Sequence, residues 1–313
     1  MATADTERLM RQATYASVAV AGVLIVTKLG AWLYSDSVAL LASLIDSTLD
    51  AFASLLNLLA VRHALVPADS DHRFGHGKAE ALAGLGQSAF VFGSALFLGF
   101  EAIHRLIQPQ PLEGGPIALG VMGISIALTL ALVLFQRHVV ARTRSVAITA
   151  DRLHYLGDLL SNMVVILALV GAWLGGPLWL DPLGGLAVAL IILKGAVDIL
   201  RHSFNQLMDR ELADGEQDDI RKTVLAQPDV RGMHDLRTRR SGTHIFIQFH
   251  LELDPDITLR AAHRIAVDVL NVLKLRYPDA DIIIHEDPGP DQIVPDSVVS
   301  GTQRSDDTKH SPS

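Results

Sequence analysis

Six apolar stretches fill most of the first 208 residues, and each is long enough to cross a lipid bilayer. A transmembrane helix needs about 20 predominantly apolar residues. The stretches cover residues 13–34, 38–62, 81–106, 116–137, 147–174 and 178–201. Short turn-forming segments, such as Gly175-Gly176-Pro177, separate them. The sequence therefore predicts an α-helical membrane protein with six transmembrane helices.

The charge balance changes after the last apolar stretch. Residues 1–208 carry 14 acidic and 13 basic residues, a net charge of −1. Residues 209–313 carry 20 acidic and 13 basic residues, a net charge of −7. An acidic soluble domain favours cations and argues against a nucleic-acid partner, which requires a basic surface. We therefore predict an N-terminal segment (1–12), a membrane domain (13–208), a soluble domain (209–290) and a disordered tail (291–313).

Lys and Arg concentrate in the connections on one side of the predicted membrane domain. Connections of this kind face the cytoplasm. The residues that set this bias are Arg8, Arg11, Arg62, Arg73, Lys78, Arg137, Arg142, Arg144 and Arg201. The opposite connections contain no Lys or Arg, apart from Arg105 at the end of the third span. With six spans, both termini and the acidic domain are expected in the cytoplasm.

Two predicted spans contain ionisable residues, which are costly in a bilayer and are candidates for function. Asp46 and Asp50 are four residues apart in the second span, and His154 and Asp158 repeat this spacing in the fifth. Residues at this spacing share one face of a helix. Together they offer three carboxylates and one imidazole, enough for a four-coordinate divalent ion. A structural polar network and a proton relay are the alternatives.

A third candidate group lies in the loop between the second and third spans. Asp69 precedes His72 by three residues, and His76 follows His72 by four. The chain contains no cysteine, so any metal must be held by histidine and carboxylate side chains. Gly75 and Gly77 would allow the loop to turn tightly around an ion. Spacing alone leaves two readings open, a metal site and a solvated loop.

These three motifs together resemble the cation diffusion facilitator family, and most closely its bacterial ferrous-iron and zinc efflux members. The third motif is the loop run Asp71-His72-Arg73-Phe74-Gly75-His76-Gly77-Lys78-Ala79-Glu80, and the combination of the three is highly specific. The resemblance implies a homodimer in a bacterial inner membrane that exchanges cytoplasmic metal for external protons by alternating access. It assigns Asp46, Asp50, His154 and Asp158 to the transport site and Asp69, His72 and His76 to a loop site.

The acidic domain has the pattern of a small αββαβ unit. Helical patterns cover residues 216–226 and 259–277, and strand patterns cover 233–239, 243–253 and 281–285. The resemblance implies a metallochaperone-like cytoplasmic domain with a binuclear site at the dimer interface. The implied ligands are His234, His250, His263, His285 and Asp287, and His244 is left out. It also implies an ion pair between Lys78 and Asp209.

The predicted function is efflux of a divalent transition metal, Zn²⁺ or Fe²⁺, with Cd²⁺, Co²⁺ and Mn²⁺ as further candidates. A site of three carboxylates and one imidazole accepts this range, and no organic cofactor is expected. The main alternative is a membrane-bound metal sensor without transport. A second alternative is an intramembrane metallohydrolase, but the chain has no His-Glu-x-x-His motif and all four candidate groups are used as ligands. We therefore do not expect an enzyme.

Overall fold

The computed structural model describes residues 3–108, 116–174, 177 and 179–289. The predicted disordered tail, 291–313, lies outside the described residues. The chain divides into two compact units. The first contains the six long helices and Thr238–Phe246, and the second contains Ala213–Arg237 and the residues from Ile247 onward.

Six long helices make up the first unit, and all six are long and apolar enough to cross a membrane. They are α1 (Thr3–Ser35), α2 (Val38–Ala64), α3 (Lys78–Ile107), α4 (Pro116–Thr143), α5 (Val146–Trp173) and α6 (Leu180–Leu207). The six predicted spans are confirmed. The helix α1 begins well before residue 13, because its polar first turns continue the helix and include a Glu7–Arg11 pair four residues apart.

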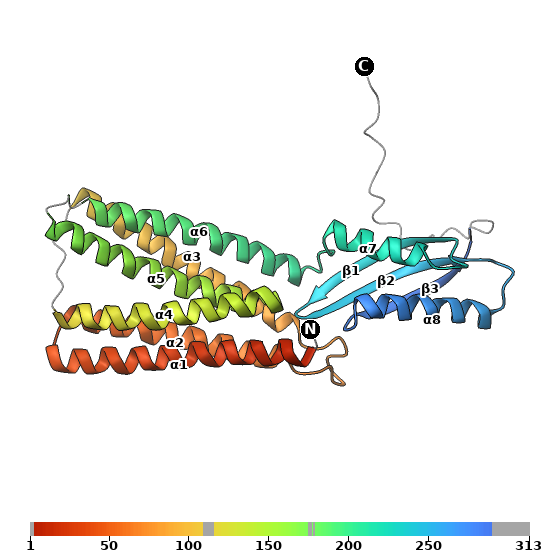
Figure 1. Cartoon of the computed structure of the whole chain (residues 1–313), viewed down its shortest axis with the longest axis horizontal. Helices are drawn as coiled ribbons and strands as arrows, with labels where there is room; N and C mark the ends of the chain where they lie inside the picture. Colours follow the sequence, from red (N-terminus) through yellow and green to blue (C-terminus); the bar gives the residue numbers. More distant parts are fainter. Residues whose placement is uncertain (1–2, 109–115, 175–176, 178, 290–313) are drawn as a thin grey trace, which may run out of the picture. The chain divides into compact units, whose positions relative to one another are not determined.

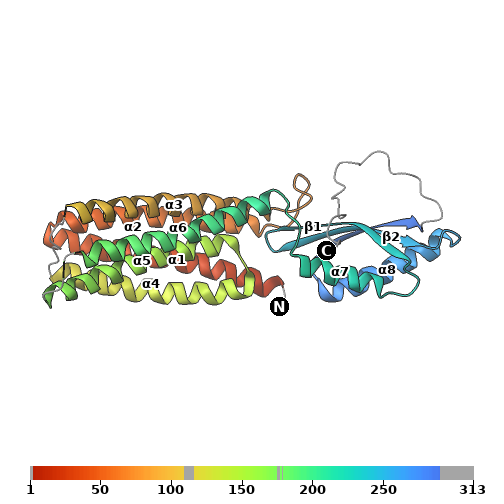
Figure 2. The ribbon, with the colours of Figure 1, turned by 90° about the horizontal axis from the view of Figure 1, so that it is seen from above.

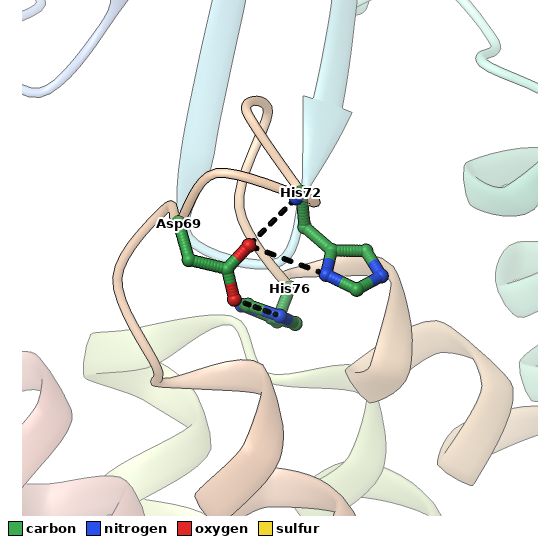
Figure 3. A group of neighbouring side chains, drawn as sticks. All are labelled: Asp69, His72 and His76. Atoms are coloured by element: carbon green, nitrogen blue, oxygen red, sulfur yellow. Dashed lines mark hydrogen bonds and ion pairs between the residues drawn. The ribbon is translucent and has the colours of Figure 1, made fainter.

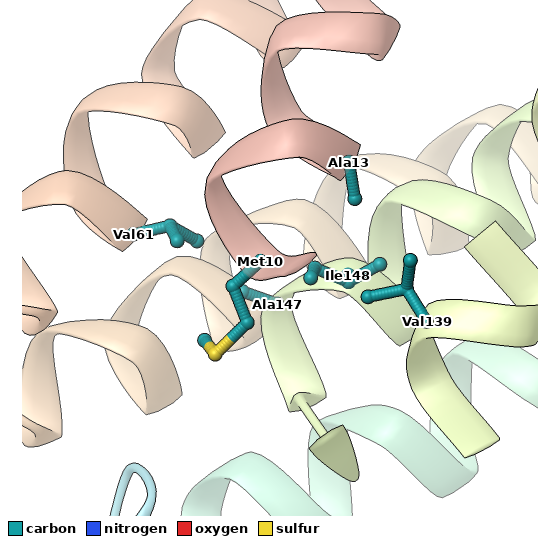
Figure 4. Packing of buried hydrophobic residues seen from close by; sticks show 6 residues of the cluster. All are labelled: Met10, Ala13, Val61, Val139, Ala147 and Ile148. Atoms are coloured by element: carbon teal, nitrogen blue, oxygen red, sulfur yellow. The ribbon is translucent and has the colours of Figure 1, made fainter. Parts of the chain in front are cut away.

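The six helices run side by side along their length (Figures 1 and 2). The helix α3 packs against α6 and also contacts α2 and α5. The helix α1 packs against α2 and α4, and α5 also contacts α2, α4 and α6. A cluster of buried residues joins the first turns of α1 to the end of α2, the end of α4 and the start of α5 (Figure 4). Its members are Met10, Ala13, Val61, Val139, Ala147 and Ile148. This cluster fixes α2 and α5, which carry the predicted transport ligands, against their neighbours.

Large apolar side chains point away from the interior of the first unit. Val26 and Phe97 are both 70% exposed, and Leu167 is 66% exposed. Such a surface is unfavourable in water but matches the hydrocarbon of a bilayer. The first unit is therefore a multi-pass membrane domain.

The elements after the membrane helices follow the predicted αββαβ order. They are α7 (Asp214–Leu225), β1 (Gly232–Ser241), β2 (His244–Leu253), α8 (Leu259–Arg276) and β3 (Asp281–Pro288). The three strands form one sheet with β2 in the centre. Both helices lie on the same side of this sheet (Figure 2).

The alternation of residues along β2 explains this two-layer arrangement. Phe249, Leu251 and Leu253 are at most 2% exposed and face the helices, whereas His250 lies between them in sequence and points the other way. On α8, the apolar side chains of Val269 and Leu273 are also buried. The uncovered face of the sheet is therefore left for polar side chains.

Candidate metal centres

The first candidate centre lies inside the membrane domain, where α2 meets α5. His154 Nε2 is 2.9 Å from Asp50 Oδ1 and 3.6 Å from Asp158 Oδ2. One ligand atom from each of these three residues lies within 4.8 Å of the other two. The two residues on α5 meet because the helix is continuous through both of them, as their spacing of four predicts.

Asp46 is the fourth predicted ligand, and it is not part of this close group of three. It lies one turn before Asp50 on α2 and lines the same cavity of about 640 Å³ as Asp50, His154 and Asp158. The structure therefore places all four predicted residues around one cavity, and ligand atoms of three of them lie within 4.8 Å of one another.

The imidazole of His154 is buried, and its Nε2 faces the carboxylates of Asp50 and Asp158. Its side chain is only 6% exposed, and Nε2 makes no hydrogen bond of normal geometry with any described residue. Phe90 and Tyr155 flank the ring, with centroids 5.7 and 5.3 Å away. A buried ring nitrogen that faces two carboxylates suits a divalent transition metal, for which imidazole and carboxylate are ordinary ligands.

Lys28 on α1 is a cavity residue that the sequence analysis did not select. Its Nζ donates to Ser47 Oγ at 2.6 Å and to Ser43 O at 3.2 Å, and the side chain lines the cavity with the four candidate ligands. The sequence alone could have indicated Lys28, because a lysine within an apolar span is costly in a bilayer and is therefore a candidate for function. An ammonium at this position would offset part of the charge of the carboxylates.

Asp151 is a second buried carboxylate near the cavity, but hydrogen-bond donors surround it. It is 1% exposed, and its Oδ2 accepts from Ser17 Oγ at 2.6 Å and from Gln136 Nε2 at 2.7 Å. Ser54 Oγ lies 3.5 Å from Oδ1 and 2.8 Å from the hydroxyl of Tyr155. The network joins α1, α2, α4 and α5, so we assign it a structural role.

Replacement of Asp151 tests this role. Asp151→Ala should destabilise the membrane domain by about 1–3 kcal/mol, because the buried donors of Ser17 and Gln136 lose their acceptor. Asp151→Asn keeps one acceptor oxygen and should cost less. Thermal unfolding in detergent measures both, and Asp198→Ala, at an exposed position on α6, is the matched control. Equal stability of Asp151→Ala and Asp198→Ala would contradict the assignment.

The second candidate centre is the loop that precedes α3. The carboxylate of Asp69 faces the rings of both His72 and His76 (Figure 3), with Oδ1 at 3.4 Å from His72 Nδ1 and Oδ2 at 3.4 Å from His76 Nε2. The backbone N–H of His72 donates to Asp69 Oδ1 at 2.6 Å and lowers the pKa of this carboxyl. The three predicted loop residues therefore converge, with their ligand atoms within 4.8 Å of one another.

The third candidate centre lies on the uncovered face of the sheet in the second unit. His234 from β1, His250 from β2 and Asp287 from β3 bring their ligand atoms within 4.8 Å of one another. His250 Nδ1 is 2.7 Å from Asp287 Oδ2, and His234 Nε2 is 3.4 Å from the same oxygen. Neighbouring strands of one sheet thus unite residues that are distant in the sequence.

The remaining two predicted ligands lie beside this group. His285 Nε2 is 3.1 Å from Asp287 Oδ1, so it can bind an ion on the other side of the carboxylate. His263 on α8 is separate, 74% exposed and 3.9 Å from Glu286. Glu252, which the sequence pattern did not single out, lies 2.8 Å from His234 Nδ1 and leaves Nε2 of that ring directed at Asp287.

The ion pair between Lys78 and Asp209 is present within the first unit. Lys78 Nζ is 3.0 Å from Asp209 Oδ1, and Arg239 Nη1 is 3.3 Å from Asp209 Oδ2. Asp209 directly follows the last turn of α6, so the pair holds the start of α3 against the end of α6. All three side chains are partly exposed, and a pair of this kind contributes about 0–1 kcal/mol.

Comparison with known protein families accounts for nearly the whole chain. Residues 14–208 match the cation efflux transmembrane domain, and residues 212–289 match the cytoplasmic domain of cation efflux proteins. The chain belongs to the cation efflux family. As a member of this family it is a transporter of divalent metal cations, and the family is one of transporters rather than of enzymes.

Individual relatives agree with the cation efflux assignment. The chain is 46% identical over 283 residues to the cation-efflux pump FieF of Klebsiella pneumoniae. The match covers 90% of this chain and 93% of the relative. It is 47% identical over 283 residues to FieF of Shewanella oneidensis, with 89% and 94% covered. Among solved structures, the metal-bound C-terminal domain of the CzcD transporter from Thermotoga maritima is 30% identical, with a TM-score of 0.24, over 26% of this chain and all (100%) of that domain.

Proposed function

We propose that this cation efflux protein exports Zn²⁺ or Fe²⁺ from the cytoplasm in exchange for external protons, with both termini on the cytoplasmic side of a bacterial inner membrane. The observation that carries the proposal is the convergence of Asp50, His154 and Asp158 on a cavity inside the membrane domain. Asp46 lines the same cavity and completes a four-ligand set. Buried ionisable groups of this kind mark ion pathways.

Competition between metal and protons supplies the coupling. Binding requires a neutral imidazole and ionised carboxylates, so an arriving ion displaces protons. When the site faces the more acidic exterior, protonation of the ligands releases the ion. The ammonium of Lys28, beside Ser47 on the wall of the cavity, partly balances the carboxylates when no metal is bound. The site faces each side in turn, with α2 and α5 as the moving gates.

Metal flux into proteoliposomes with an imposed pH gradient tests the proposal. We expect flux of Zn²⁺ and Fe²⁺ that increases with the opposing proton gradient. Co²⁺, Cd²⁺ and Mn²⁺, measured side by side, define the selectivity. A membrane-bound metal sensor would bind the same ions without flux, so absence of flux for every metal would contradict the proposal.

We further propose that the protein is a homodimer and that the cytoplasmic group regulates it. His234, His250, His285 and Asp287 offer ligands on two sides of one carboxylate, as a binuclear site requires. The fifth predicted ligand, His263 on α8, lies apart from them beside Glu286. Two such domains, each from a chain segment with net charge −7, repel one another. Bound cations would screen this repulsion. Each bound ion favours the associated state by about 2.7 kcal/mol when free metal is 100 times its dissociation constant.

Removal of this group should separate regulation from transport. The double replacement His234→Ala and Asp287→Ala should abolish the zinc-dependent approach of the two cytoplasmic domains. It should also raise the metal concentration needed for half-maximal flux. Flux at saturating metal should remain. Distances between spin labels on the two domains, with and without Zn²⁺, measure the approach. Unchanged closure, or complete loss of flux at saturating metal, would contradict the regulatory role.

A further inference from the structure

A fourth histidine lies beside the loop centre. His63 is in the last turn of α2, and its ring centroid is 4.6 Å from that of His76, with the ring planes at 65°. The rings of His72 and His76, which both belong to the loop group, are separated by the same 4.6 Å. His63 is therefore as close to His76 as the loop's other histidine is.

The three loop residues leave one coordination position open. His76 Nδ1 lies 3.3 Å from the carbonyl oxygen of Val66, to which it can donate, so Nε2 is left to face Asp69 Oδ2. His72 faces the other carboxylate oxygen with Nδ1. These groups supply three ligand atoms, whereas a closed zinc site has four.

The ring of His63 is available for this position. Its side chain is exposed at the end of the helix, and across the described part of the chain it makes no hydrogen bond or ion pair. The His63 nitrogens are not among the ligand atoms that lie within 4.8 Å of one another, so the ring must turn about its side-chain torsions to face the other three ligands. The ring already lies beside that of His76.

We propose that His63 is the fourth protein ligand of the loop centre, giving three imidazoles and one carboxylate. This inference rests on metal binding at the candidate loop centre formed by Asp69, His72 and His76. Three imidazoles favour Zn²⁺ over a harder ion such as Mn²⁺, in contrast to the carboxylate-rich membrane centre. An ion bound in this way ties the end of α2, the helix that carries Asp46 and Asp50, to the loop that leads into α3.

The absence of cysteine from the chain provides a direct test. In the full-length protein in detergent, His63→Cys places a single thiol at the position of the proposed ligand. Added Co²⁺ should then give a thiolate-to-cobalt charge-transfer band that no other residue of the chain can produce. His138→Cys, at an exposed position on α4, is the matched control and should give no such band. Absence of the band from His63→Cys, together with unchanged Zn²⁺ affinity in His63→Gln, would overturn the proposal.

Affinity provides the second test, in a background where Asp50→Asn, His234→Ala and Asp287→Ala remove the other two centres. His63→Gln should weaken Zn²⁺ binding by roughly tenfold to 100-fold or more, since even outer-shell partners of a metal contribute that much. It should also reduce the intensity of the tetrahedral Co²⁺ spectrum, whereas His138→Gln should change neither. Unchanged affinity and spectrum in His63→Gln would overturn the role of His63.

A third variant separates this inference from the loop centre itself. His76→Ala, in the same background, should abolish binding. If His76→Ala loses the ion and His63→Gln does not, the loop centre stands with three ligands and only the role of His63 is wrong. If neither replacement changes binding, the loop centre and the inference that rests on it both fail.

Discussion

Asp50→Asn and Asp158→Asn should each reduce Zn²⁺ flux by about 100-fold or more while the protein remains folded. Loss of an outer-shell partner of a metal ligand already costs about 10–100-fold, and each of these replacements removes a charged ligand outright. Asparagine has nearly the shape of aspartate, so the packing around Asp50, 2.9 Å from His154 Nε2, is preserved. Proteoliposome flux at saturating Zn²⁺ measures the effect.

Asp198→Asn is the matched control for this prediction. Asp198 lies on α6, in the same membrane domain, and is exposed rather than part of the cavity wall. It should transport at the wild-type rate. Near wild-type flux in either Asp50→Asn or Asp158→Asn would show that the transported ion binds elsewhere.

The sequence was sufficient to predict the helices and the pairs of ionisable residues that share a helix face within them, because both depend on local periodicity. Asp46 with Asp50 and His154 with Asp158 share helix faces wherever those helices pack. The length and apolarity of six segments predict six spans, since a bilayer imposes both. The alternation along β2 likewise predicts a buried face with Phe249 and Leu251 and a polar face with His250.

The partners of these residues were not predictable, because they depend on how distant segments pack. Asp151 meets Ser17 across 134 residues and Ser54 across 97 residues of sequence. His234 meets Glu252 only because β1 and β2 are neighbours in the sheet. His63 was missed for a different reason, since no short motif connects it to the loop. The sequence shows which residue types a site can use, and tertiary packing decides which of them meet.

His154→Asp should keep metal binding but change both selectivity and pH coupling. Imidazole favours Zn²⁺, whereas carboxylates suit harder ions such as Mn²⁺, so the variant should transport Mn²⁺ better relative to Zn²⁺. Histidine ordinarily has a pKa of about 6.5 and aspartate one of about 3.9. Between pH 8 and pH 6, protonation of a histidine ligand weakens metal binding, whereas an ordinary aspartate stays ionised.

The pH dependence of Zn²⁺ affinity should therefore be flatter in this variant than in the wild type, and the opposing proton gradient should drive less flux. Zn²⁺ and Mn²⁺ affinities measured between pH 6 and pH 8, together with flux under imposed gradients, test both effects. His202→Asp, at an exposed position near the end of α6, is the control for the added charge. The side chain of His154 is 6% exposed, so its replacement alters the buried group formed with Asp50 and Asp158 and leaves the protein surface unchanged. The same metal ranking and the same pH profile as in the wild type would mean that protons are exchanged at another residue.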